Sequence, residues 1–227
     1  MGPTHIPFLL SHISLYLLAT PAGPLLVDTG APGMLWFILR RLKHRHGLAP
    51  QDLAGVVLTH CHIDHCGGAA PLARLGVPIY AHERERPYLQ GEAPLPGYGG
   101  HAGRALGWLE RSTLGRRKAL PSLRCVGDDE PLCGSQWRVV PAPGHSPGSI
   151  ALWHPEARAL LSGDTLNGGL FLPHGPHPLF TQDLPRARRS ALSLLDLEPT
   201  TIYPGHGLPL DARRFAGVRR RLEAKVK

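Results

Sequence analysis

Short apolar runs alternate along the chain with segments in which apolar residues recur at helical spacing. The runs at 13–20 and 25–28 are separated by a Pro/Gly turn and predict a β-hairpin. Residues 33–46 carry apolar side chains at helical spacing and predict a helix, and the run at 54–59 predicts a buried strand. Strands that alternate with helices in this order are typical of an α/β sheet.

The rest of the chain adds further strands and three helices. The remaining predicted elements are strands at 77–82, 123–126, 137–140, 149–153, 158–163 and 200–204, a helix that follows the polar residues 60–68 and runs through residue 75, a helix at 185–197 and a basic helix from residue 211. Residues 83–120 interrupt the alternation with two helical segments around a Gly/Pro-rich stretch, which predicts an inserted helical flap. We therefore expect one domain over residues 1–227 that carries this flap.

Composition limits the class of protein. A length of 227 residues with 42% apolar side chains suffices for one full hydrophobic core. No run of about 18 unbroken apolar residues occurs, which predicts no membrane span. The N-terminal residues lack the basic segment of a signal peptide, and four cysteines suit a reducing compartment, so we expect a cytoplasmic protein.

The net charge of +8 raises the question of an anionic partner. The arginines are scattered rather than gathered into one bank, and the run at 219–221 is typical of a solvated helix face. Nucleic acid is therefore not the expected partner, and the oligomeric state is left open.

Potential metal ligands are concentrated directly after the predicted strand at 54–59. His60 and His62 project to the same side of an extended segment, and the following turn lets Asp64 and His65 reach a neighbouring point. Imidazole and carboxylate groups are zinc ligands, and two such pairs suit two adjacent cations. Cys61 alternates with the two histidines and is expected to face away, into the core.

Three more candidate ligands each follow a predicted strand and stand beside a glycine. They are His145, Asp164 and His206. Glycine allows a sharp turn and a close approach of the backbone to a metal. We expect the three side chains to share one edge of a sheet with the His60–His65 cluster.

The pattern His60-Cys61-His62-Ile63-Asp64-His65 resembles the H-x-H-x-D-H motif of the metallo-β-lactamase superfamily. The likeness extends from VDTG at 27–30 to PGHG at 204–207. It implies a four-layer αββα sandwich of two mixed β-sheets flanked by helices. It also implies two sets of metal ligands with one shared residue: His60, His62 and His145 for one metal, Asp64, His65 and His206 for the other, and Asp164 bridging both. Asp28 matches a position that supports the ligand loop.

The implied cofactors are two divalent metal ions, for which Zn²⁺ is expected and iron or manganese are alternatives. Two adjacent cations lower the pKa of a shared water and polarise a carbonyl group, so that the bridging hydroxide attacks it. Asp64, beside this water, is the candidate catalytic residue that orients it and carries its proton.

The strings THCHIDHCGG and SGDTL resemble glyoxalase II, a hydroxyacylglutathione hydrolase, and predict hydrolysis of a small ester or thioester. Only 21 residues follow His206, whereas that enzyme has a helical C-terminal domain. The alternatives are a lactonase, a β-lactamase-like hydrolase, a phosphodiesterase or nuclease, and a persulfide dioxygenase with one iron on His60, His145 and Asp164. Lactonases place a tyrosine where this chain has Asn167.

Two segments are expected to select a small-molecule substrate: the flap at 83–120 and the loop at 167–180. Phe171, His174, His177 and Phe180 in the loop either line a pocket or pack the loop against the core. A metal-binding protein without turnover is the non-enzymatic alternative, and the complete set of seven ligands speaks against it.

Overall fold

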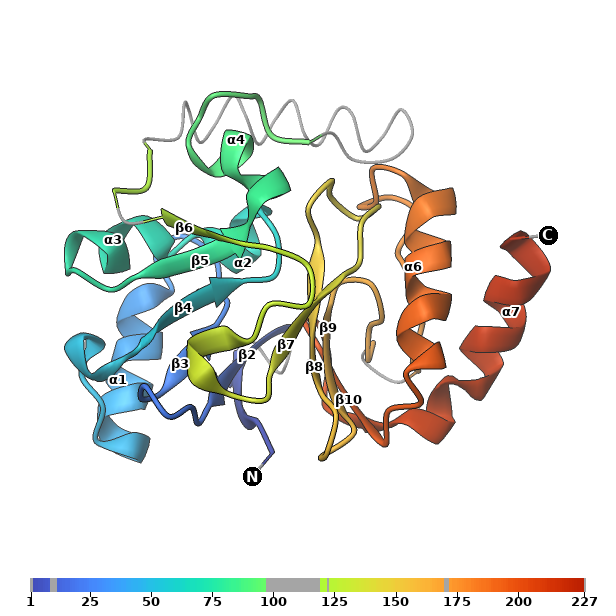
Figure 1. The fold of residues 1–227 in the computed structure, drawn as a ribbon, viewed down its shortest axis with the longest axis horizontal. Coiled ribbons are helices and arrows are strands. Elements are labelled where there is room, and N and C mark those ends of the chain that lie inside the picture. Colours follow the sequence, from blue (N-terminus) through green and yellow to red (C-terminus); the bar gives the residue numbers. More distant parts are fainter. Residues whose placement is uncertain (1, 9–11, 97–118, 122, 170–171, 227) are drawn as a thin grey trace.

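Two β-sheets lie side by side at the centre of the computed structural model, with helices on their outer faces (Figure 1). The structure describes residues 2–8, 12–96, 119–121, 123–169 and 172–226. The first sheet has six strands in the order β1-β2-β3-β4-β5-β6: β1 (Thr4–Phe8), β2 (Ile13–Leu18), β3 (Leu25–Val27), β4 (Gly55–Leu58), β5 (Ile79–His82) and β6 (Leu123–Val126). The second has five in the order β11-β10-β9-β8-β7: β7 (Arg138–Pro141), β8 (Ile150–His154), β9 (Ala159–Gly163), β10 (Thr201–Pro204) and β11 (Leu210–Asp211).

The helices fall into two groups, one beside each sheet (Figure 1). Beside the first sheet are α1 (Leu35–His46), α2 (Ile63–Cys66), α3 (Ala69–Arg74) and α4 (Arg86–Leu89). Beside the second are α6 (Leu184–Asp196) and α7 (Ala216–Val226). Short 3-10 turns complete the described elements: η1 (Pro50–Asp52), η2 (Glu83–Glu85), η3 (Leu132–Gly134) and η4 (Ala212–Phe215).

The central strands are apolar throughout because they are buried on both faces. In β4, Val57 points into the core between the two sheets, whereas Val56 and Leu58 point into the core under the helices. In β9, Leu161 lies between the sheets and Leu160 packs toward α6 and α7. Three layers of apolar contact therefore separate four layers of structure, and the predicted αββα sandwich is confirmed.

Strand direction brings the ligand-bearing loops to one edge. Strands β3, β4, β5 and β6 are parallel, as are β9 and β10, so the carboxyl ends of neighbouring strands meet. Two backbone hydrogen bonds join the sheets there, from Ile150 N–H to the Thr59 carbonyl (3.0 Å) and from Ser14 N–H to the Gly205 carbonyl (2.8 Å). The segments after β4, β9 and β10 are thereby held against one another.

The sequence pattern did not predict the edge strand β1. Its run THIPF contains Pro7, which lacks an N–H and is tolerated because only β2 pairs with this strand. The first part of the predicted flap forms η2 and α4, while residues 97–118 lie outside the described residues. No helix in the described part of the chain is long and apolar enough to cross a membrane.

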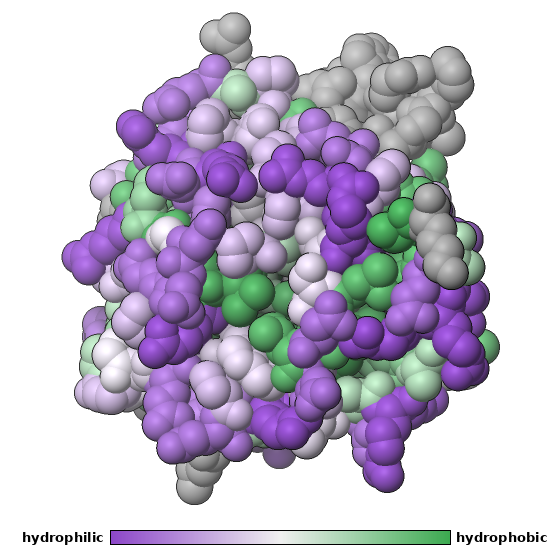
Figure 2. Space-filling model, turned by 45° about the vertical axis from the view of Figure 1, so that its right-hand side comes forward, coloured by the Kyte–Doolittle hydropathy of each residue, from purple (hydrophilic) through white to green (hydrophobic). Residues whose placement is uncertain are grey.

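Hydrophilic residues spread over the whole face of the molecule shown in Figure 2 and are interrupted by apolar ones. In α7, Arg219 forms ion pairs with Asp196 (2.8 Å) and Glu223 (3.8 Å), while Arg220 and Arg221 are exposed. The basic run at the end of the chain thus lies on a solvated helix face.

Candidate metal centre

The loop after β4 directs His60 and His62 to one side. Their ring centroids are 4.7 Å apart. Cys61, between them, is fully buried in the core under the helices, as expected from the alternation. The chain then turns into α2, which carries Asp64 and His65.

His145, in the loop between β7 and β8, completes a cluster of three imidazoles. Its Nε2 lies 2.8 Å from His62 Nδ1 and 3.2 Å from His60 Nε2. All three side chains are buried, and burial is the main cause that lowers the pKa of each. The imidazoles are therefore neutral, as metal ligands must be. We call His60, His62 and His145 the imidazole half of the site.

Asp64, His65 and His206 form a second cluster, which we call the carboxylate half. His65 Nε2 lies 3.3 Å from His206 Nε2, and Asp64 Oδ2 lies 3.4 Å from His206 Nε2 and 3.6 Å from His65 Nε2. Unlike the imidazole half, it is partly open: the side chains of Asp64 and His206 are 31% and 32% exposed.

Asp164, which follows β9, lies between the two halves. Its Oδ1 is 3.3 Å from His65 Nε2, and its Oδ2 is 3.4 Å from His145 Nε2 and 3.1 Å from His206 Nε2. A Cβ on Gly205 would lie 2.5 Å from Asp164 Oδ1, so only glycine leaves room for this carboxylate. One carboxylate thus faces donor groups from both halves.

The electrostatics of the carboxylate half are those of buried opposite charges. Burial alone would lower the pKa of His65 and His206, but the carboxylates around them raise it, for His206 to about 10. Burial alone would raise the pKa of Asp64 and Asp164, but the adjacent histidines hold it well below its usual range. Protons on the two histidines therefore compensate the carboxylate charge when no cation does.

The donor set fits two cations. The trios His60–His62–His145, His60–His65–Asp164 and Asp64–His65–His206 each place one ligand atom per residue within 4.8 Å of the others. Asp164 Oδ1 is buried and accepts no hydrogen bond, which is the state of an oxygen that has a cation as its partner. The structure thus brings all seven predicted ligands into one two-part site.

Asp28 supports the ligands from behind, at a positive φ of 62°. Its carboxylate accepts hydrogen bonds from Thr59 N–H (2.8 Å) and Thr59 Oγ (2.9 Å), and lies 2.8 Å from His65 Nδ1. The contact with Nδ1 leaves His65 Nε2 facing the site. Thr59 Oγ in turn lies 3.1 Å from His60 Nδ1, which leaves His60 Nε2 facing the imidazole half.

The N-terminal hairpin holds the loop that carries His206, a role that the sequence did not predict. Ser14 Oγ donates to the Gly207 carbonyl (2.6 Å), and the Tyr16 hydroxyl donates to the Pro204 carbonyl (2.8 Å). The backbone carbonyl of His12 accepts from His206 Nδ1, so that Nε2 turns to the metal centre. No local pattern in the sequence predicts these contacts, because they join residues about 190 positions apart.

In the loop at 167–180, Asn167 supports the metal site, whereas other described residues of the loop contact one another. Asn167 Nδ2 donates to the Asp164 carbonyl (2.8 Å), so this amide closes the turn that carries the shared ligand. His174 Nδ1 contacts the Gly175 carbonyl (2.8 Å), and the rings of His177 and Phe180 lie 4.8 Å apart. Phe171 lies outside the described residues.

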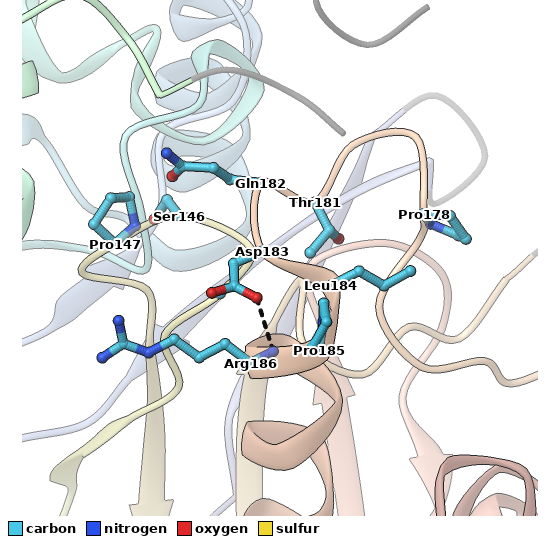
Figure 3. Close-up of a pocket in the computed structure, with 10 residues that line it drawn as sticks. Ser146, Pro147, Pro178, Thr181, Gln182, Asp183, Leu184, Pro185 and Arg186 are labelled. Carbon is cyan, nitrogen blue, oxygen red and sulfur yellow. Dashed lines mark hydrogen bonds between the residues drawn. The ribbon is translucent and has the colours of Figure 1, made fainter. Parts of the chain in front are cut away.

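A pocket of about 620 Å³ lies beside the loop that carries His145, and none of the seven candidate ligands lines it. Figure 3 shows it between the loop of Ser146 and Pro147 and the segment from Pro178 that leads into α6. Arg186 and Gln182 supply polar side chains to its wall, and Thr181 Oγ lies 3.5 Å from His145 Nδ1. The pocket therefore lies on the Nδ1 side of the His145 ring, whereas Nε2 faces the other ligands.

The geometry defines the class of this protein: it is an αββα sandwich with a two-part site of histidines and carboxylates at the sheet edges. The family described as the Metallo-beta-lactamase superfamily matches residues 10–206. The chain belongs to this superfamily.

Individual relatives agree with this assignment. The "Probable metallo-hydrolase YflN" of Bacillus subtilis (strain 168) is 30% identical over 222 residues, which cover 89% of this chain and 83% of that protein. A hydroxyacylglutathione hydrolase of Anaeromyxobacter dehalogenans (strain 2CP-C) is 34% identical over 154 residues, 66% of this chain but only 45% of that protein. The solved structure of TTHA1623 in a di-iron-bound form has a TM-score of 0.67 at 27% identity, and covers 96% of this chain and 98% of that chain.

Proposed function

We propose that this chain, a metal-dependent hydrolase of the metallo-β-lactamase superfamily, cleaves a small ester or thioester in the manner of a hydroxyacylglutathione hydrolase. The observation that carries the proposal is Asp164, whose two oxygens face donor groups of both halves. Similarity to hydroxyacylglutathione hydrolases over part of the chain supports the choice of bond.

His60, His62 and His145 would hold one cation, Asp64, His65 and His206 the other, and Asp164 both, with Zn²⁺ as the expected metal. Divalent cations bound at such a site activate water at neutral pH and polarise a carbonyl group. Iron is the alternative metal, because imidazole and carboxylate ligands suit several first-row ions. A relative of the same fold holds two irons.

Asp64 is proposed to orient the attacking water and to carry its proton toward the leaving group. Its low pKa keeps the carboxylate ionised, so Oδ2 can accept a hydrogen bond from the attacking water and orient it. With 31% of the side chain exposed, Asp64 lies on the open side of the site, where a substrate and water can reach it.

The pocket beside His145 would hold the part of a small-molecule substrate that does not react. Its wall offers hydrogen-bond donors on Arg186 and Gln182 together with the apolar rings of Pro147 and Pro185. Such a mixed lining suits an acyl or thiol group that carries polar substituents.

The test is the initial rate of metal-replete protein on S-lactoylglutathione, an acyl-homoserine lactone, a chromogenic cephalosporin and a phosphodiester. We expect the thioester to be hydrolysed fastest and the rate to collapse in Asp64→Ala. A preference for the lactone, the β-lactam or the phosphodiester would replace the proposed substrate class. One bound iron per chain, with no hydrolysis, would favour the dioxygenase.

A further inference from the structure

Glu85 is a fully buried carboxylate that the metal site described above does not use. It ends η2, the turn that directly follows β5. Because β5 runs parallel to β4, with Leu58 opposite Ala81, the end of β5 lies beside the start of the His60–His65 loop. Glu85 therefore stands behind the metal centre.

Its two oxygens bind the two loops that carry the imidazole half. Oε2 accepts from the backbone N–H of Cys61 (2.8 Å), the residue between His60 and His62. Oε1 accepts from Ser146 Oγ (2.7 Å), next to His145, and from the backbone N–H of Gly148 (2.6 Å). These short distances are those of charge-assisted hydrogen bonds.

The packing around Gly148 shows that this contact is built into the fold. A Cβ at Gly148 would lie 2.8 Å from the backbone nitrogen of Glu85 and 2.9 Å from the backbone carbon of Arg84. Any larger residue would force η2 away from the His145 loop. The close packing at Gly148 and the hydrogen bonds of Glu85 thus both set the distance between η2 and the His145 loop.

Neutral hydrogen-bond donors surround the Glu85 carboxylate. No described cationic side chain forms an ion pair with it, and its three partners are neutral donors. A buried carboxylate without a cation is costly unless it is hydrogen-bonded. The three neutral donors on the two ligand-bearing loops therefore satisfy this buried carboxylate.

We propose that Glu85 is a positioning residue for metal binding: it holds the His60–His62 loop and the His145 loop at the separation at which their three imidazoles share one cation. The inference rests on the metal-dependent function proposed above. It assigns to Glu85 an effect on the cation of the imidazole half and none of comparable size on the cation of the carboxylate half.

Glu85→Gln is the sharpest variant because it keeps the shape and one acceptor oxygen. That oxygen can satisfy Ser146 and Gly148, but the new NH₂ group then faces the N–H of Cys61, donor against donor. We expect a folded protein whose affinity for the first Co²⁺ or Zn²⁺ falls about 10- to 100-fold, the usual effect of losing a partner behind a ligand. Glu83→Gln, an exposed change in the same turn, is the matched control and should bind like the wild type.

The measurement is titration of metal-free protein with Co²⁺ against a competing chelator, read by the absorption of the bound ion. The melting temperature of the metal-free protein is measured in parallel. A merely structural Glu85 would lower that temperature and leave affinity per folded molecule unchanged, and this result would overturn the proposal. A wild type that binds no metal would instead remove the proposed function itself.

Ser146→Ala provides a second variant in case Glu85→Gln does not fold. It removes one of the three hydrogen bonds and leaves the carboxylate in place, so we expect first-metal affinity to fall about 2- to 10-fold. Unchanged affinity in Ser146→Ala together with unchanged or unmeasurable affinity in Glu85→Gln would count against the proposal.

Discussion

The two halves of the metal centre differ in burial, charge and support. The histidines of the imidazole half are 1–3% exposed and burial lowers the pKa of each, so three neutral, buried rings meet there. In the carboxylate half, Asp64 and His206 are about one third exposed, and carboxylates raise the pKa of both histidines.

This difference indicates two ways of holding a cation. Neutral rings at fixed positions attract a cation only if the surrounding loops keep their lone pairs convergent, so geometry governs the imidazole half. The carboxylate half already attracts positive charge, which protons supply in the metal-free protein, so charge and pH govern it. We expect the first ion to be bound tightly and the second to exchange more readily.

The largest effect is expected when one histidine is removed from each half in turn and metal content and turnover are compared. His145→Ala removes one of three rings from the buried half, and we expect less than one ion per chain and a loss of turnover of about 10³-fold, or about 4 kcal/mol of transition-state stabilisation. His206→Ala should retain about one ion per chain. Metal content of purified protein and initial rates test this, and equal metal loss in both variants would contradict the difference between the halves.

The next largest effect is expected at Asp28, whose carboxylate contacts His65 of the carboxylate half directly and reaches His60 of the imidazole half only through Thr59. Asp28→Asn keeps the size and tolerates the positive φ, but removes the charge behind His65. We expect affinity for the second ion to fall about 10- to 100-fold while the first ion is retained. Competition titration with a chelator resolves the two steps.

A matched control exists for this change. Asp129 also has a positive φ, of 58°, but its side chain is exposed and pairs with Arg138 on the surface. Asp129→Asn should leave both steps of the titration unchanged. If Asp129→Asn weakens metal binding as much as Asp28→Asn does, the effect of Asp28→Asn does not arise from the contact of Asp28 with His65.

Local patterns allowed much of the fold and the ligand set to be predicted from the sequence. Most strands and helices coincide with the predicted runs to within a few residues, because central strands buried on both faces are apolar throughout. His60, His62, Asp64 and His65 stand close together in the sequence, and their alternation alone placed two rings on one side and Cys61 on the other.

The supports of the ligands could not be predicted in the same way because they are long-range. The sequence gives no sign that the carbonyl of His12 lies against His206, and Glu85 stands in a segment that reads as an insertion. Each of these residues acts through a backbone group or a partner loop, so its role depends on a register between strands that composition and spacing do not specify.

The smallest expected effect is a pH dependence of the metal-free protein, in which the two halves act in opposite windows. The pKa of His206 is about 10 in the folded protein against an ordinary 6.5, so its stabilisation is complete below pH 6.5 and is lost as the pH rises toward 10. The pKa of His145 is lowered, mainly by burial, so keeping it neutral costs stability below pH 6.5, where the unfolded chain is protonated.

Melting temperatures measured with a chelator test this difference. Between pH 6.5 and 9 they should fall by a few degrees less in His206→Asn than in the wild type, since about 1 kcal/mol corresponds to 2–4 °C at this chain length. His145→Asn should instead change the slope below pH 6.5, and exposed His46→Asn should change neither. If both site variants alter the same window, the two halves do not differ in charge as the structure indicates.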